Sequence, residues 1–355
     1  MKKIIILTPD LEKIGGVSIF VNAFKGCWDL EEVYFVRGGK GKNIFSKIIG
    51  TLLDFPRLIK TILNNKNNFF LVNTSMNENA FKRDYWFLKI LKLFGVQPNV
   101  FIHGFKESFF NSIPLHKLKI FENSQNIFVL SEEHRNLLKS KIHFDKIYVE
   151  TTVADNTFVE SNFPDKNFES DFLNVLFLGR LEKRKGIWPL LKAFELLHQN
   201  NQTIKLEIVG HGNEEAEILK WLDSKKLPNI TFSGKKVGVE KIKAFNRNQI
   251  YILPSDIEGE GLPITIIEAL FAGMIIITTK VGGVADFFEN EKMGFFLNSN
   301  NQDEVYDKLT SLSKINPKIL EKISNFNKNY ANHNCRVDIV ARRIKNIMYG
   351  TSTNN

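Results

Sequence analysis

The sequence predicts an α/β protein made of two doubly wound domains, each with a parallel sheet that is covered by helices on both faces. Short apolar runs alternate with helical segments along most of the chain, which is the pattern of repeated strand–helix units. A polar stretch at 155–172, rich in Asn, Asp and Ser, divides this alternation into two series and is typical of a linker. The expected domains are residues 1–165 and 170–330.

The first series begins with a buried strand at 3–7, followed by Gly15-Gly16 and a helix with apolar residues at helical spacing. Further strands are expected at 32–36, 69–73, 99–103, 126–130 and 146–150. Helical segments lie between them, and this alternation predicts a parallel sheet that is buried on both faces.

The second series repeats the same plan without a short internal sequence repeat. Strands are expected at 175–178, 205–209, 230–233, 249–253 and 274–278, with helices at 187–198 and 214–224. An amphipathic run at about 335–350 follows the complete second domain, so we expect it to cross back onto the first. Ligands of doubly wound sheets bind at the carboxyl ends of the strands, so two facing sheets predict a ligand cleft.

Composition describes a globular chain of 355 residues with 43% hydrophobic and 25% charged residues. Its two cysteines, Cys27 and Cys335, lie far apart in sequence, which favours a reducing compartment over a disulfide scaffold. The apolar run near the first residue is too short for a signal core or a membrane span. We therefore expect a cytoplasmic protein without an integral anchor.

The formal net charge of +9 is compatible with a nucleic acid, an anionic membrane or an anionic substrate. No motif or aromatic platform supports nucleic-acid binding. Between residues 37 and 66 there are seven basic residues and one acidic residue, and the apolar residues of 43–63 have near-helical spacing. This segment either lies on an anionic membrane surface or packs as a helix, interrupted before Pro56, on the first sheet. Both interpretations stay open.

The segment 254–273, PSDIEGEGLPITIIEALFAG, is the most informative of the chain. Glu260 and Glu268 stand eight positions apart, the first before a Gly-Leu-Pro turn and the second on an apolar helix. A strand end, a loop and a helix start form an anion site, because the first backbone N–H groups of a helix lack internal partners. Carboxylates there suit sugar hydroxyls that flank a phosphate, so the segment indicates a nucleotide sugar.

Three further features are candidates for the same site. In the loop 179–186, GRLEKRKG, Arg180 and Lys185 could hold one anion from two sides, whereas Lys183 and Arg184 are expected to be solvated. Gly15-Gly16 either lets the backbone approach a phosphate or makes a tight turn. His103 ends an expected strand and either faces the ligand or is satisfied by local hydrogen bonds.

No spacing typical of a zinc site or of an Asp-x-Asp metal–diphosphate site is present in the sequence. We expect no metal and no other cofactor. The charge of a leaving diphosphate would then be met by Arg180, Lys185 and helix N-termini.

With these residues in hand, the chain resembles the retaining glycosyltransferases of family 4, which have the GT-B fold. The family's paired glutamates match Glu260 and Glu268, and its phosphate loop matches 179–186. Its amino-terminal glycine loop matches Gly15-Gly16, and its acceptor-side histidine matches His103. The segment 282–286, GGVAD, is similar to another family motif, with Asp286 where glutamate is usual. The resemblance implies two Rossmann-like domains that face each other across a cleft.

The resemblance also implies roles for individual residues. Glu260 would contact the hydroxyls of the donor sugar, Glu268 would hold the ribose, and the amides of Leu262 and Ile264 would face the diphosphate. Pro263 has no N–H to contribute, and Glu258 offers an alternative register for the first glutamate. The implied catalytic residues are Glu260, His103, Arg180 and Lys185, and the implied donor-binding residues are Gly15, Gly16, Arg180, Lys185, Glu260, Gly261, Leu262, Pro263, Ile264 and Glu268.

The activity implied is transfer of a hexose-type sugar from a UDP- or GDP-sugar to an acceptor hydroxyl, with retained configuration. A lipid-linked or saccharide acceptor in cell-envelope polysaccharide or glycolipid synthesis fits a basic cytoplasmic protein, which could be peripheral on the inner face of the membrane. Contacts to the base are expected near 233–236. Two alternatives remain open: a nucleotide-sugar epimerase of related fold and a non-catalytic nucleotide-sugar-binding subunit.

Overall fold

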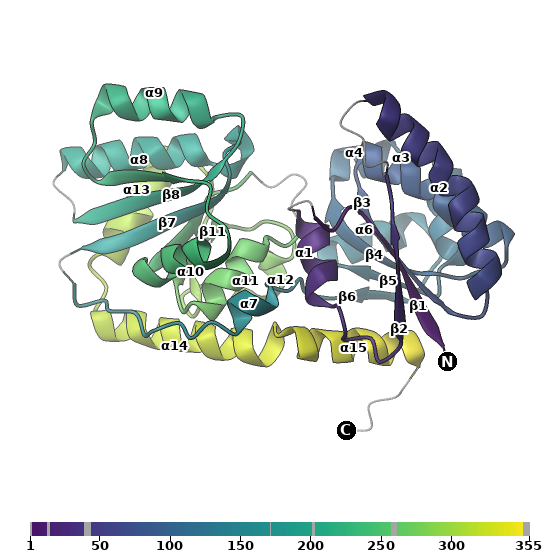
Figure 1. Cartoon of the computed structure of the whole chain (residues 1–355). Helices are drawn as coiled ribbons and strands as arrows, with labels where there is room; N and C mark the ends of the chain where they lie inside the picture. The colour runs from purple at the N-terminus through teal and green to yellow at the C-terminus, as the bar shows by residue number, and fades with distance from the viewer. Residues whose placement is uncertain are drawn as a thin grey trace. The chain divides into compact units, whose positions relative to one another are not determined.

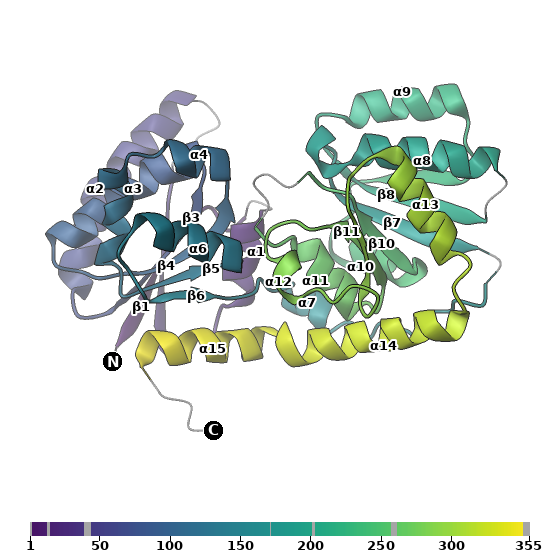
Figure 2. The ribbon, with the colours of Figure 1, turned by 180° about the vertical axis from the view of Figure 1, so that it is seen from behind.

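The computed structural model describes residues 2–12, 15–38, 44–170, 172–200, 203–256 and 261–350, with the backbone alone at 44–48. Internal contacts divide the chain into two units (Figures 1 and 2). The first unit comprises Met1–Asp155, Glu258–Leu262 and Val337–Asn355, and the second comprises Asn156–Ile257 and Pro263–Arg336. Glu258 and Glu260 lie outside the described residues.

The first unit is built on a six-stranded parallel sheet with the order β2-β1-β3-β4-β5-β6. Its strands are β1 (Lys3–Thr8), β2 (Glu31–Val36), β3 (Phe69–Met76), β4 (Asn99–Phe105), β5 (Asn126–Val129) and β6 (Ile147–Val149). Its helices are α1 (Gly16–Ala23), α2 (Ile44–Asn65), α3 (Glu78–Leu93), α4 (Glu107–Ser112), α5 (Leu115–Leu118), η1 (Lys119–Asn123), α6 (Glu132–Lys141) and α15 (Val337–Tyr349).

Both faces of this sheet are covered, as the continuous apolar strands require. The four residues from Ile4 to Leu7 are all buried, although successive side chains point to opposite faces. On one face, Leu58 of α2 and Phe87 of α3 pack into one core with Val100 of β4. On the other face, Phe20 of α1 lies 4.7 Å from the ring of Phe101.

Helix α2 corrects one expectation, because it continues through Pro56 instead of being interrupted before it. A proline ring removes one N–H donor but can be tolerated in a long helix that is held by packing. Leu58 and Ile62, which follow the proline, are fully buried in the core. This packing confirms the interpretation of the segment as a helix on the first sheet. Its solvent-facing side is still compatible with binding to an anionic membrane surface.

The carboxyl-terminal helix α15 packs on the first unit, as expected. Arg343 makes two hydrogen bonds to the carboxylate of Glu150, at 2.6 and 2.9 Å. The hydroxyl of Tyr349 donates to the Trp28 carbonyl at 2.8 Å. The preceding helix α14 (Pro317–Asn334) belongs to the second unit.

The second unit has a six-stranded parallel sheet with the order β12-β11-β10-β7-β8-β9. Its strands are β7 (Leu173–Arg180), β8 (Ile204–His211), β9 (Ile230–Gly234), β10 (Ile250–Leu253), β11 (Ile275–Thr279) and β12 (Gly294–Leu297). Its other helices are α7 (Asn156–Val159), η2 (Lys183–Lys185), α8 (Ile187–Gln199), α9 (Glu215–Lys225), α10 (Gly238–Arg247), α11 (Ile264–Phe271), α12 (Val284–Phe287) and α13 (Gln302–Leu312). The prediction of two doubly wound parallel sheets is confirmed.

The polar stretch 155–172 is more structured than its composition suggests. Its start forms α7, and the ring of Phe158 packs against Phe245 of α10 with a centroid distance of 5.0 Å. Phe163 and Phe168 are also buried. The aromatic residues scattered among the polar ones fix this segment on the second unit.

Candidate functional site

The loop after β7 presents one exposed cation at the end of a strand. Arg180 is the last residue of β7, and its side chain is 62% exposed. Its Nη1 lies 2.8 Å from Oε1 of Glu182, whose other oxygen accepts from Arg184 Nε at 2.6 Å. Partial burial opposes ionisation of Glu182, but the hydrogen bond from Arg184 and the nearby basic charges lower its pKa below the ordinary value. Glu182 therefore orients both guanidinium groups.

The same loop contains one buried cation. Lys185 is only 8% exposed, whereas Lys183 and Arg184 beside it are exposed as expected. A buried ammonium group needs compensating polar partners, so the Lys185 side chain is held within the loop and does not extend into solvent. The loop thus combines the buried charge of Lys185 with the exposed charge of Arg180 at the end of β7.

Gly186 allows this loop to approach the segment that follows β10. Its φ of +72° is rare for residues with a side chain, and a Cβ there would lie 1.9 Å from the Pro254 carbonyl oxygen. The Arg184 carbonyl accepts hydrogen bonds from the Asp256 amide at 2.5 Å and from the Ser255 hydroxyl at 3.3 Å. The structure therefore brings the loop 179–186 to the start of the segment that was predicted to carry the first glutamate.

Helix α11 begins directly after Pro263, which occupies its N-cap position without a side-chain cap. Ile264 is its first residue, and the first internal bond at this end runs from the Ile266 amide to the Pro263 carbonyl at 3.0 Å. The amides of Ile264 and Thr265 precede the regular helical bonds and can serve an anion. Gly261 and Leu262 lead into this turn, and Leu262 is buried.

The hydroxyl of Thr265 is also fixed, by a partner that the sequence did not reveal. It accepts a 2.5 Å hydrogen bond from Tyr251 of β10. The carboxyl end of β10 and the start of α11 are thus tied together.

Glu268 is fully buried and forms an ion pair with Lys241 of α10. The Lys241 ammonium group lies 5.4 Å from the ring centroid of Phe158. A carboxylate without solvent needs such a partner, because an uncompensated buried charge is costly. Sequence reasoning missed Lys241. The sequence showed it only as one of several basic residues on the helix before β10. A ligand hydroxyl at Glu268 would share the carboxylate with this lysine.

In the first unit, the imidazole of His103 is enclosed by aromatic rings and one amide. The imidazole stacks on the ring of Phe101 with a centroid distance of 4.3 Å, and it lies edge-to-face with the ring of Phe20 at a centroid distance of 4.8 Å. Its Nε2 lies 2.8 Å from Asn73 Oδ1. The Asn73 Nδ2 donates to the Leu7 carbonyl at 3.2 Å, so the network assigns the proton to His103 Nε2 and leaves Nδ1 as the acceptor nitrogen.

The charge state of His103 follows from these surroundings. Loss of solvent around the ring, and less strongly the charge of Arg37, lower the pKa of His103 to about 3. The imidazole is therefore neutral at physiological pH.

Behind Asn73 lies a buried charged cluster that sequence reasoning missed. Arg37 follows β2, is 4% exposed, and contacts Asp84 of α3 with Nη1 at 2.6 Å from Oδ1. It also donates to the Asn73 carbonyl. Asp84 accepts from Thr74 at 2.6 Å and from Arg83 at 2.8 and 3.0 Å. Burial lowers the pKa of Arg37 to about 10, with Asp84 opposing the shift.

Gly15 and Gly16 lie at the amino end of α1. Gly15 is extended, with φ of −171°, and its carbonyl accepts from Ser18 Oγ at 2.9 Å. A Cβ at Gly15 would lie 3.5 Å from that hydroxyl, an ordinary contact. Any residue can adopt the backbone conformation of Gly15. A tight turn therefore does not explain why glycine stands at this position. Within the described ranges, no group of three acidic, His or Cys residues could hold a metal ion.

Residues 158–331 match the family model described as glycosyl transferases, group 1. Apart from 258–262, which belong to the first unit, this segment lies in the second unit. The amylovoran biosynthesis glycosyltransferase AmsK of Erwinia amylovora is 25% identical over 128 residues, which cover 35% of this chain and 31% of AmsK. A poly(ribitol-phosphate) α-N-acetylglucosaminyltransferase of Staphylococcus aureus is 27% identical over 159 residues, covering 41% of this chain and 32% of that protein. The chain thus spans about a third of the length of these two relatives.

Among solved structures, Anabaena HepE in complex with UDP has a TM-score of 0.76 at 12% identity, and the match covers 99% of this chain and 100% of HepE. HepE has also been solved with UDP-glucose. At this identity the likeness defines the fold, and the fold is GT-B.

Proposed function

We propose that the chain is a glycosyltransferase that moves a hexose-type sugar from a nucleotide-diphosphate donor to an acceptor hydroxyl. The observation that carries this proposal is the loop 179–186, which lies inside the matched segment and is locked against 254–256. The loop carries Arg180 and Lys185, and helix α8 begins directly after it at Ile187. The name of AmsK supports a role in polysaccharide biosynthesis.

The proposed reaction retains the anomeric configuration. The bond between the anomeric carbon and the diphosphate oxygen breaks while the acceptor oxygen bonds to that carbon from the same face. The acceptor proton passes to the departing phosphate oxygen, so no protein base is required. Arg180 and Lys185 meet the charge that develops on the leaving group, together with the first amides of α11. No metal has a part in this scheme, and chelation with EDTA is expected to leave the rate unchanged.

The acceptor side is assigned to the first unit. A neutral His103 can orient a sugar by accepting a hydroxyl hydrogen bond at Nδ1, but it brings no positive charge to the reaction. Glu268 is assigned to the ribose and Glu260 to the donor sugar. We propose the retained configuration, the hexose-type sugar and these contacts together. We also propose a location at the cytoplasmic face of the membrane.

UDP is the proposed nucleotide, because HepE, which shares the fold, binds UDP and UDP-glucose. A thermal-shift panel of UDP-, GDP- and ADP-sugars compares the candidates. Stabilisation by GDP-sugars alone would redirect the proposal to a different donor.

The test is sugar transfer from the stabilising donor to a panel of saccharide and lipid-linked acceptors. Arg180→Ala should lower kcat by roughly 10²–10³-fold, as the loss of one transition-state charge contact does. Lys183→Ala is the matched control, since this exposed lysine lies in the same loop, and its rate should stay near that of the wild type. Equal rates for all three proteins would refute the phosphate role of the loop.

The two alternatives give other results. An epimerase would convert the donor sugar without any acceptor, and the comparisons do not favour it. A non-catalytic subunit would bind the donor in calorimetry and transfer it to no acceptor.

A further inference from the structure

The helices α2, α3 and α5 form one layer over the first sheet, and the outer side of this layer is unusually apolar. In the described part of the first unit, exposed large hydrophobic residues are confined to these three helices. Five of them are more than half exposed: Leu52, Leu53, Leu63, Trp86 and Leu93. Leu93 is 81% exposed. Scattered single residues would be ordinary, but their confinement to one layer indicates an interaction surface.

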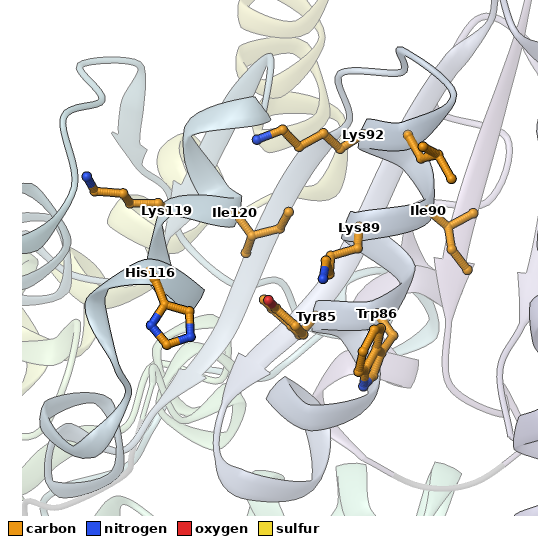
Figure 3. Close-up of a pocket in the computed structure, with 9 residues that line it drawn as sticks. Tyr85, Trp86, Lys89, Ile90, Lys92, His116, Lys119 and Ile120 are labelled. Atoms are coloured by element: carbon orange, nitrogen blue, oxygen red, sulfur yellow. The ribbon is translucent and has the colours of Figure 1, made fainter.

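The layer is hollowed between α3 and the α5–η1 segment, where a groove of about 720 Å³ is lined by Trp86, Lys89, Lys92, Leu93 and Lys119, among others. Figure 3 shows the α3 side chains on one side of the groove and those of His116 and Lys119 on the other. A second hollow of about 340 Å³ shares Tyr85 and Trp86 with the first. None of the residues that line either hollow is acidic.

The charge of this surface is positive and uncompensated. Five exposed lysines line the two hollows, namely Lys82, Lys89, Lys92, Lys117 and Lys119. None of the five has a carboxylate partner within 4 Å among the residues that the structure describes. The Lys89 ammonium group lies 5.0 Å from the ring centroid of Trp86 and 5.5 Å from that of Tyr85. Cations therefore sit directly beside the exposed rings.

We propose that this lysine–tryptophan surface, formed by the outer sides of α2, α3 and α5, docks on an anionic phospholipid bilayer. Leucine and tryptophan side chains can enter the boundary between headgroups and acyl chains, while lysines at the same level contact lipid phosphates. Long lysine side chains suit this place, because their stems cover apolar surface and their charge stays in water.

Other occupants fit the chemistry less well. A second copy of the chain, joined through a two-fold axis, would bring the same lysines against one another. A nucleic acid would satisfy the lysines but would give no apolar medium to leucines that are more than 60% exposed. The combination of exposed leucines, tryptophan and lysines on one layer favours lipid.

Lipid binding needs neither donor nor acceptor, so it is independent of the proposed transfer reaction. The experiment is flotation of the full chain with vesicles of phosphatidylcholine and phosphatidylglycerol, compared with vesicles of phosphatidylcholine alone. Binding is expected to the anionic vesicles and to weaken as salt is raised, since exposed charges are screened.

Two variants separate the contributions. Lys89→Gln/Lys92→Gln should lower the partition coefficient roughly 25-fold, about fivefold for each basic residue near an anionic surface. Trp86→Ser/Leu93→Ser should lower binding to the anionic vesicles at high salt, where the apolar contribution dominates. The matched control is Leu219→Ser/Lys220→Gln on α9 of the second unit, where Leu219 is 44% exposed, and it should bind like the wild type. Circular dichroism melts establish that each variant is folded.

Several outcomes would overturn the proposal. These are no flotation with anionic vesicles, equal flotation with neutral ones, or an equal loss in the α9 control. A concentration-dependent dimer that Trp86→Ser/Leu93→Ser dissociates would assign the surface to a second copy instead. Transfer of sugar to a soluble acceptor, measured on the same proteins, keeps failure of this inference distinct from failure of the proposed activity.

Discussion

Substitution of Gly186 by alanine tests how the candidate phosphate loop is held. Two costs add at this position. A side chain at φ of +72° costs about 1–2 kcal/mol. The new Cβ would also lie 1.9 Å from the Pro254 carbonyl oxygen, which is backbone and has to move, and overpacking of this kind costs about 1–3 kcal/mol. The expected loss of stability is therefore about 2–5 kcal/mol.

Two other glycines separate these costs. Gly95 has the same φ of +72° but nothing within 4 Å of its would-be Cβ, so Gly95→Ala should lose only the conformational part, about 1–2 kcal/mol. Gly179 lies in the same loop as Gly186, has no positive φ, and also has open space. Gly179→Ala should leave stability nearly unchanged.

The assay is urea unfolding followed by circular dichroism, with hydrogen exchange to assign each loss to the unit that carries the substitution. Displacement of 254–256 should also raise the donor KM of Gly186→Ala and leave that of Gly95→Ala unchanged. A Gly186→Ala protein no less stable than Gly95→Ala would refute the close approach as a constraint on the loop.

Two further predictions concern buried charges and protons. Lys241→Met leaves Glu268 buried without its cation and should lower the free energy of unfolding in urea by about 3–5 kcal/mol. The control Lys243→Met breaks an ion pair with Glu240 in which the side chains are 60% and 55% exposed, and it should lower that free energy by no more than about 1 kcal/mol. Equal losses would contradict the role of Lys241. Since the pKa of His103 is lowered to about 3 in the folded chain, the unfolded chain takes up the proton first, so the stabilisation is complete above about pH 6.5 and is lost as the pH falls towards 3. His103→Gln should flatten the pH dependence of unfolding in this window, and an unchanged slope would count against the neutral imidazole.

Much of the fold could be predicted because the strands are short, continuous apolar runs. The run at 3–7 differs from β1 by a single residue, and the carboxyl-terminal helix was expected because it followed a complete domain. The continuous helix α2 could not be predicted in the same way. Proline is a local signal for interruption, but burial of Leu58 and Ile62 beyond it outweighs that signal.

The candidate site divides along the same line. Arg180 could be placed at a strand end, and its loop was a candidate for the same site as the segment 254–273, because the carboxyl ends of parallel strands meet at one edge of a sheet. The hydrogen bonds from Ser255 and Asp256 to this loop agree with that expectation. The partner of Glu268 could not be predicted. Lys241 lies 27 positions earlier on another helix, and its residue type alone does not distinguish it from the exposed Lys243 two positions later.

Charge counts along the sequence fail for a related reason, and Arg37 illustrates it. This arginine belonged to the basic stretch 37–66 that raised the membrane interpretation, yet its side chain is 1% exposed and paired with Asp84. The Arg37 guanidinium donates to the Asn73 carbonyl, and the side chain of Asn73 accepts from His103 Nε2. The charge of Arg37 therefore acts in the interior of the unit. A lipid surface responds only to exposed charge. The cations that a lipid surface would meet are the five exposed lysines around α3, α5 and η1, which carry no carboxylate partner among the described residues.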